Sequence, residues 1–137
     1  MNRIFGTVLM LLVASACMMQ PVTSENVMRF GGGVGPGSLC ERIEAQRSVA
    51  KGHQEMDTLI GEFKRRNPGV QENWLRDLRK GLVTIGMPED VARCTWTAYL
   101  VNESIGYGQH TKQYRGSNSY SYFFVDGRTG RVTYISA

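Results

Sequence analysis

The sequence predicts an α+β fold, in which N-terminal helices pack on one face of a small C-terminal antiparallel β-sheet arranged as a meander. Two observations lead to this prediction. In residues 38–80 apolar residues recur at steps of three and four, which is the spacing of one helix face. Residues 99–137 are instead rich in aromatic and β-branched residues, and glycine, asparagine and serine divide them into short runs. The 137-residue length favours one domain, 38–137, with a helical part at 38–81 and a second part at 82–137.

Residues 1–16 have the composition of a bacterial-type signal peptide. Arg3 supplies a positive start, and the apolar run that follows, 4–13, is too short to span a bilayer as a stable anchor. Ala14, Ser15 and Ala16 then supply the small residues that a signal peptidase needs. We therefore expect the protein to be exported.

The cysteine directly after this leader predicts a lipid anchor. Residues 12–17 resemble a lipobox, after which Cys17 becomes the acylated, palmitate-bearing first residue of the mature chain. No aspartate follows it, so an outer-membrane lipoprotein that faces the periplasm is expected. Ala14 stands where such a box more often has leucine, and the alternative is ordinary cleavage to a soluble periplasmic or secreted protein.

Residues 17–37 carry no periodicity and end in the glycine-rich run 31–37. Such a composition is typical of a flexible linker, so we expect a tether between the lipid anchor and the folded domain. A phosphate-binding loop is not predicted, because no Lys-Ser or Lys-Thr pair follows the glycines.

A long first helix is expected from Ser38 to about residue 66. Ser38 and Glu41 have the spacing of a capping box, and Asn67, Pro68 and Gly69 end the helical pattern. His53 falls on the apolar stripe of this helix, which predicts a position at the edge of the core.

Two shorter helices should follow. Residues 70–80 keep the helical spacing, and Gly81 is a typical residue for ending a helix. Pro88 suits the first turn of a third helix, where Glu89 and Asp90 complement the positive end of the helix dipole.

The remaining residues predict strands near 99–101, 112–114, 120–125 and 131–135. The run 126–130, Asp-Gly-Arg-Thr-Gly, has the composition of a hairpin turn between the last two strands. Strand alternation would place Tyr120, Tyr122 and Phe124 on one face, with Phe123 and Val125 on the other.

Three features of residues 82–137 carry a resemblance to a known family. The run 85–91 is a Gly-Met turn that opens a helix, Trp96 falls where this helix ends, and 120–128 with 132–135 form an aromatic strand, a turn and a final strand. This pattern resembles the small outer-membrane lipoproteins typified by BamE and SmpA, although that family usually has glycine and then proline soon after the tryptophan. The resemblance implies two helices on a three-stranded antiparallel sheet and a non-catalytic role at the cell envelope.

No residue pattern indicates an enzyme. Neither His53 nor His110 has a second ligand at metal spacing, and the Gly-x-Ser-x-Gly motif of serine hydrolases is absent. The helix dipole accounts for the neighbouring acids Glu89 and Asp90. The net charge of +4 is spread along the chain among acidic residues, so nucleic-acid binding is not predicted either. We expect no metal, no cofactor and no small-molecule substrate.

The cysteines allow a disulfide. If Cys17 is acylated, Cys40 and Cys94 are left, and two thiols of one small domain tend to pair in an oxidising periplasm. The alternative is that Cys94 is a small buried apolar residue.

The strands carry more aromatic residues than one helix-covered face requires, so some of them should face outward. Tyrosine and arginine are enriched at the centres of protein interfaces. We therefore expect a partner-binding face drawn from Tyr114, Tyr120, Tyr122, Tyr134, Arg115, Arg128 and Arg131. The expected function is protein–protein binding at the cell envelope, as a scaffold or assembly accessory. The alternative is a periplasmic or secreted inhibitor of an enzyme such as a hydrolase.

Acylation of Cys17 can be tested directly. The intact mass of the mature protein from the membrane fraction should equal residues 17–137 plus a diacylglyceryl group, and Cys17→Ser should abolish the added mass. A soluble protein that begins at Cys17 or Met18 without acyl mass would contradict the lipid anchor.

Overall fold

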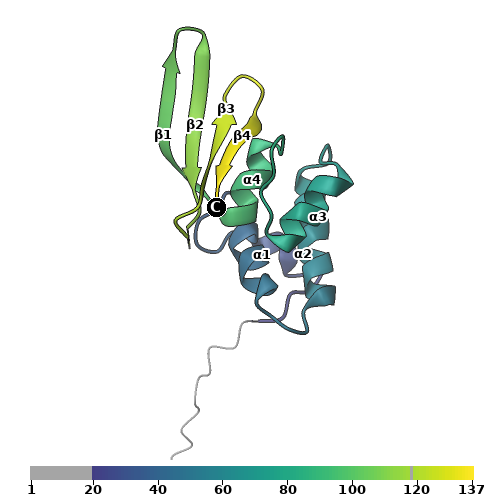
Figure 1. Ribbon diagram of the computed structural model, residues 1–137. Helices are drawn as coiled ribbons and strands as arrows, with labels where there is room; N and C mark the ends of the chain where they lie inside the picture. Colours follow the sequence, from purple (N-terminus) through teal and green to yellow (C-terminus); the bar gives the residue numbers. More distant parts are fainter. Residues whose placement is uncertain (1–19, 118) are drawn as a thin grey trace, which may run out of the picture.

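The computed structural model describes residues 20–117 and 119–137, and over these residues the predicted α+β fold is confirmed. Helices come first and an antiparallel sheet follows, as Figure 1 shows. The helical elements are a 3₁₀ helix η1 (Val27–Arg29), α1 (Leu39–Arg47), α2 (His53–Arg66), α3 (Glu72–Lys80) and α4 (Glu89–Trp96). The strands are β1 (Tyr99–Gly106), β2 (Gln109–Arg115), β3 (Tyr122–Asp126) and β4 (Arg131–Ser136), in the spatial order β1-β2-β3-β4.

The described part of the chain is larger than the resemblance implied. It has four α-helices where two were implied, and its sheet has four strands where three were implied. The fourth strand arises because β1 pairs along β2 from Tyr99 to Gly106 and the chain then reverses at Tyr107 and Gly108, both at positive φ.

The expected long first helix is wrong, because the structure divides it into α1 and α2. The chain turns tightly at Gly52, where an added Cβ would lie 1.9 Å from Nε2 of Gln46. His53 therefore lies exposed at the start of α2 and not at the edge of the core. The predicted cap of α1 is present in modified form. Ser38 Oγ accepts from the Glu41 backbone N–H at 3.1 Å, but Glu41 Oε1 accepts from Gly37 N at 3.2 Å and not from Ser38.

Helix α4 lies directly on the sheet and joins it to the other helices. On the sheet side, the fully buried Phe123 packs between Trp96 and Tyr114, with ring centroids 5.8 and 5.4 Å away. On the opposite side, Cys94 of α4 forms a disulfide with Cys40 of α1, with an S–S distance of 2.12 Å. A link across 54 residues is worth about 4 kcal/mol in the chain-entropy model.

The two tryptophans, Trp74 and Trp96, are only half-buried. Trp96 rests on Phe123 and donates its Nε1–H to Gly81 O at 3.1 Å, which satisfies the polar group of its ring. Trp74 lies beside Gly86, at 3.9 Å from the position a Cβ would occupy there. The core is filled by aliphatic residues of the helices and of the inner sheet face, together with Phe63, Tyr114 and Phe123.

The expected tether is wrong for residues 20–37, because this segment packs onto the domain. Val22 and Val27 are buried in the core, and Gly31 forms a parallel bridge with Ser38. Arg66 of α2 fixes the segment further by donating to Phe30 O at 2.8 Å and to Gly31 O at 3.3 Å. Isolated valines and backbone bonds leave no periodic signal, which explains why the sequence pattern did not reveal this packing. The signal peptide and Cys17 lie outside the described residues.

A pair of neighbouring phenylalanines tests the two sides of the sheet. Phe123→Ala should lower the free energy of unfolding by about 3–5 kcal/mol, because it removes a fully buried ring. Phe124→Ala, on the open side, should cost less than about 1.5 kcal/mol. Urea unfolding of both variants measures the difference, and equal losses would contradict the assignment of the inner face.

Acid should weaken the contact that holds residues 30–31. Arg65 donates to both oxygens of Glu62, and Arg66 donates Nε–H to Oε1 at 2.9 Å. The pKa of Glu62 is lowered to about 2, chiefly by the Arg65 hydrogen bonds and also by Arg66, against the opposing effect of burial. A lowered carboxyl pKa stabilises the fold above the ordinary glutamate value of about 4.3, and this stability is lost as pH falls from there towards 2.

Unfolding free energy measured from pH 7 to pH 2 should therefore fall less steeply below pH ~4.3 in Glu62→Gln than in the parent. Glu72→Gln is the control, because it removes an exposed carboxylate paired with Lys64 and should cost under about 1 kcal/mol while keeping the parental acid response. Identical acid slopes in Glu62→Gln and the parent would contradict this assignment.

Candidate partner-binding surface

Three aromatic side chains form a cluster on the sheet face that points away from α4. We call Tyr122, Phe124 and Tyr134 the aromatic face. The ring centroids lie 5.8 Å apart for Tyr122–Phe124, 5.7 Å for Phe124–Tyr134 and 6.3 Å for Tyr122–Tyr134. Strand alternation explains the arrangement, since Phe123 and Val125 between and beside these rings are buried on the inner face.

Polar residues of β2 border the aromatic face. Gln113 stands opposite Phe124 and Arg115 stands opposite Tyr122 in the strand register. The Arg115 guanidinium lies 5.2 Å from the ring centroid of Tyr120, which precedes β3 and is 90% exposed. An aromatic centre with a polar rim is the usual anatomy of a protein interface.

Tyr114 was expected on this face, but it is buried on the other one. It pairs with Phe123 in the register, so both side chains point towards α4. Its hydroxyl donates to Glu89 of α4, which also accepts from Lys112 Nζ at 3.2 Å. The guanidinium of Arg93 lies 5.2 Å from the ring centroid of Tyr114.

The pKa values of this inner cluster follow from the same contacts. Burial would raise the pKa of Glu89, but the hydrogen bonds from Tyr114 and Lys112 outweigh it and lower that pKa. Burial and the neighbouring Glu89 carboxylate both raise the pKa of Tyr114. The helix dipole was thus an incomplete explanation of Glu89, which fastens α4 to β2.

The three expected arginines do not gather at one place. Arg115 lies at the end of β2, opposite Tyr122 in the strand register. Arg131 is opposite Asp126 in the register, at the other end of β3. Arg128 donates to Gly108 O at 2.8 Å, and Arg131 donates to Gly86 O at 3.2 Å. Arg115 alone of the three therefore borders the aromatic face.

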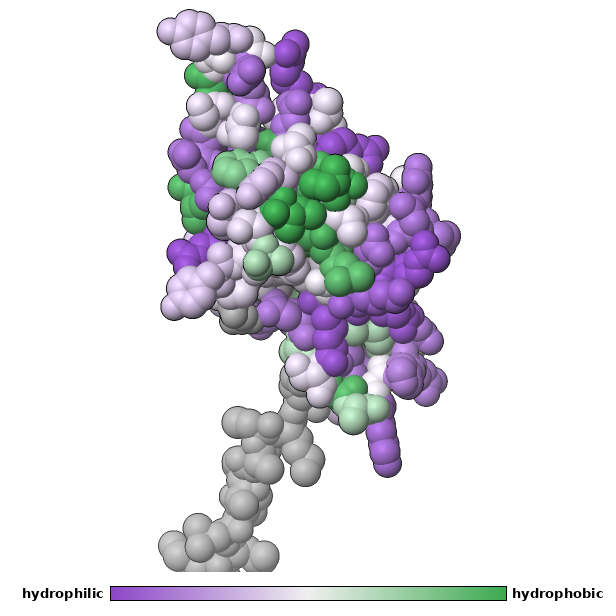
Figure 2. Space-filling model, in the orientation of Figure 1, coloured by the Kyte–Doolittle hydropathy of each residue, from purple (hydrophilic) through white to green (hydrophobic). Residues whose placement is uncertain are grey.

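The segment before α4 adds apolar surface at the β4 edge. Gly86 donates to Val132 O at 2.8 Å and Pro88 bridges Arg131, so this segment runs along β4. Leu82 and Ile85 just before it are 50% and 60% exposed. Figure 2 shows hydrophobic side chains gathered between the sheet and α3, where the link from α3 to α4 runs.

The β1–β2 hairpin forms a second exposed feature, which extends beyond β3 and β4 in Figure 1. Every residue of β1 is exposed, with Ile105 at 75% and Tyr107 fully exposed at the tip. His110 lies in β2, where its Nε2 is 2.5 Å from Glu103 Oε1. The imidazole occupies the space where Gly127 has no side chain.

Within residues 20–117 and 119–137, no three histidine, cysteine, aspartate or glutamate side chains gather as metal ligands would. None of the helices in this range has the length and apolar character needed to cross a membrane. The aromatic face is the strongest candidate for a working surface because its three rings gather on the face of the sheet that α4 does not cover. Comparison with known proteins found no match for this chain among protein-family models, curated proteins or solved structures.

Proposed function

We propose that this chain is an exported, lipid-anchored cell-envelope protein that acts by binding another protein through the aromatic face, as a scaffold or assembly accessory. The observation that carries the proposal is the cluster of Tyr122, Phe124 and Tyr134 on the helix-free face of the sheet. Tyr134 is 51% exposed although its ring touches two others. Grouped aromatic rings at a water-exposed surface are typical of interaction sites.

Tyrosine suits this role because it offers a large contact area while few torsions must be ordered. The three rings already pack on one another, so little side-chain entropy remains to be lost on binding. Arg115 at the border supplies a fixed charge beside the apolar centre.

The cysteine usage supports export. A disulfide between Cys40 and Cys94 persists in an oxidising compartment, which the periplasm provides. The leader 1–16 and the lipobox-like run before Cys17 likewise predict export. An anchor at Cys17 would join the described domain through residues 18–19 alone, because packing begins within the segment that starts at Gln20.

Thr97 departs from the BamE and SmpA pattern, and its backbone has the left-handed conformation in which helices commonly end. That family usually carries glycine just after the tryptophan that ends the helix, and Thr97 follows Trp96 here. Thr97 has a φ of 45°, which glycine adopts without strain and threonine rarely does. Hydrogen bonds from its hydroxyl to Glu44 and with Ser117 hold the threonine in this conformation.

A second candidate function rests on the protruding hairpin. An inhibitor that plugs an enzyme needs a projecting element with apolar side chains, and Ile105 and Tyr107 have this position. A hydrolase with an open cleft is the partner class that this candidate implies.

Two double variants distinguish these functions. The test is affinity capture from detergent-solubilised envelopes, with mass spectrometry of what is retained. Tyr122→Ser with Tyr134→Ser should abolish capture of the partner, while the unfolding free energy drops by only about 1–2 kcal/mol because the rings pack mainly on each other. Ile105→Ser with Tyr107→Ser should leave both capture and stability unchanged.

The reverse pattern, with capture lost only in the hairpin variant, would replace the proposal by the inhibitor function. Capture of every partner by both folded variants would show that neither surface is used. Circular dichroism of each variant confirms that the comparison is made on folded protein.

A further inference from the structure

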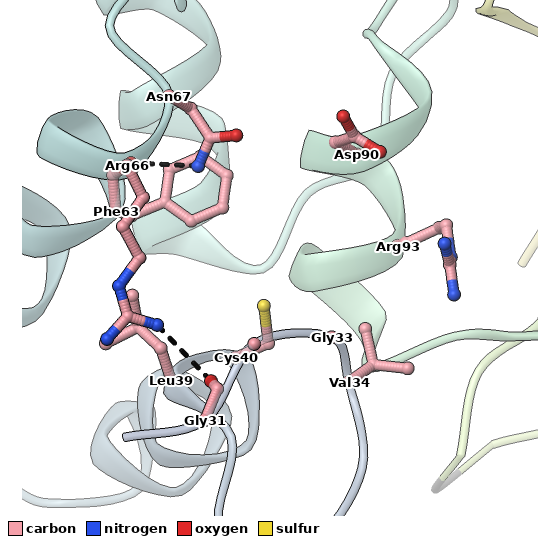
Figure 3. A pocket seen from close by; sticks show the side chains of 11 residues that line it. Gly31, Gly33, Val34, Leu39, Cys40, Phe63, Arg66, Asn67, Asp90 and Arg93 are labelled. Atoms are coloured by element: carbon pink, nitrogen blue, oxygen red, sulfur yellow. Dashed lines mark hydrogen bonds between the residues drawn. The ribbon is translucent and has the colours of Figure 1, made fainter. Parts of the chain in front are cut away.

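A cavity of about 250 Å³ lies between the start of α1, the end of α2 and helix α4, as Figure 3 shows. Its walls include the buried side chains of Leu39, Cys40 and Phe63. The Arg93 guanidinium points away from this space and lies 5.2 Å from the ring centroid of Tyr114. The lining therefore specifies no ligand chemistry, and the open edge of the sheet says more about a partner.

The edge strand β1 exposes a run of apolar side chains. Every residue of β1 is exposed, and Leu100, Val101 and Ile105 are 45%, 44% and 75% exposed. Sheet edges are normally covered, or they carry several charges that prevent pairing with another chain. Glu103 is the single charged residue of β1. The strand therefore presents an open backbone edge with little of the usual protection.

The opposite edge of the sheet is occupied at the start of β4. Gly86 donates to Val132 O at 2.8 Å, and Val132 donates to Met87 O at 2.9 Å. Within residues 20–117 and 119–137, β1 pairs with β2 alone. The outer backbone groups of β1 are thus available to a strand from another molecule.

Three β1 side chains share the inner side of the sheet. A bulge after Leu100 removes Val101 from the alternation, so Glu103 and Ile105 continue the row that Leu100 begins. Residues that stand opposite one another in a ladder point to the same face. The register gives the pairs Leu100↔Tyr114, Glu103↔Lys112 and Ile105↔His110, and alternation along β2 places all three β2 residues on the side of the buried Tyr114.

The carboxylate in the middle of this row is not paired with a lysine or arginine of the described residues. The contact of Glu103 is with His110, whose Nε2 lies 2.5 Å from Oε1. Lys112 stands opposite Glu103 but directs its Nζ to Glu89 at 3.2 Å. The Glu103 side chain remains 38% exposed. An incoming strand therefore meets one negative charge between two apolar side chains.

A second copy of this chain is a poor match for the edge. The antiparallel register that sets Leu100 opposite Ile105 of a second copy also sets Glu103 opposite Glu103 of that copy. Like charges directly opposite one another in a ladder are destabilising. A lysine or arginine opposite Glu103, with an apolar residue two positions away on each side, complements all three side chains of the row.

We propose that β1 accepts an added strand from another protein, an extended segment with the pattern apolar-polar-basic-polar-apolar. Its basic residue lies opposite Glu103, and its two apolar residues lie beside Leu100 and Ile105. Its polar residues follow the outward side, which Asn102 and Ser104 share. Main-chain hydrogen bonds of the added strand supply the affinity, and the side-chain row supplies the selectivity.

Two short peptides test this proposal. The lysine peptide is acetyl-Thr-Val-Thr-Lys-Thr-Val-Thr-amide, and the glutamate peptide has glutamate in place of the lysine. NMR of the ¹⁵N-labelled full chain follows hydrogen exchange of the β1 amides. At a lysine peptide concentration about ten times its dissociation constant, the outer amides of β1 should exchange about tenfold more slowly, because the added strand bonds them. The lysine peptide should bind about fivefold more tightly than the glutamate peptide.

A charge reversal assigns the selectivity to Glu103. Glu103→Lys should invert the preference, so that the glutamate peptide binds about fivefold more tightly than the lysine peptide. Glu72→Lys is the matched control, because it makes the same change at an exposed carboxylate of α3, and it should keep the parental preference. Tyr122→Ser with Tyr134→Ser should bind both peptides as the parent does, since the aromatic face takes no part.

The added strand and the aromatic face are independent. A short strand binds weakly by itself, because the entropy lost in ordering it offsets much of the interaction. Ile105→Ser with Tyr107→Ser should therefore weaken the lysine peptide about threefold while capture through the aromatic face persists.

Three outcomes would overturn the proposal. These are unchanged exchange of the β1 amides up to about 5 mM lysine peptide, equal affinity for the two peptides, and an unchanged preference in Glu103→Lys. Slow exchange of the β1 amides without peptide, increasing with protein concentration, would assign the edge to a second copy instead. All of these outcomes concern β1, so the proposed function of the aromatic face stands or falls separately.

Discussion

Helix α4 packs between the sheet and the other helices, and both of its sides are fastened. Towards the sheet, Glu89 accepts from Tyr114 and Lys112, and Trp96 packs on Phe123. Towards the helices, Cys94 is covalently joined to Cys40 of α1. A helix of eight residues is too short to be stable alone, so its position depends on these contacts with both layers.

The position of α4 divides the sheet into a covered face and an open one. Residues that alternate towards α4, such as Phe123 and Val125, are fully buried. Their neighbours Tyr122 and Phe124 face water and gather with Tyr134. The same strand thus contributes both to the stability of the fold and to the proposed interaction surface, because its side-chain period is two.

The proposed interaction surface depends on α4. The aromatic face exists because α4 covers only the inner side of the sheet. The sheet edges also differ. The segment before α4 hydrogen-bonds to the start of β4 at that edge, while every residue of β1 is exposed. An exposed edge strand is a site where another chain can add a strand, and β1 is such an edge strand.

The sequence alone determined the fold class, the C-terminal end of α3, the start of α4, the meander order and the alternation within β3. These features rest on local chemistry, such as Gly81 at positive φ, Pro88 before Glu89, and the period of two in an aromatic strand.

Tertiary structure alone decided the break between α1 and α2, the packing of residues 20–37 and the burial of Tyr114. Each of these depends on contacts between residues distant in sequence or on backbone bonds. Gly52 turns against Gln46, Arg66 binds the carbonyls of Phe30 and Gly31, and Tyr114 points inward because the register sets it opposite Phe123. A tyrosine in a strand can point inward or outward, and its residue type does not say which. Strand register and the placement of α4 decide that Tyr114 lies in the core and Tyr134 on the surface.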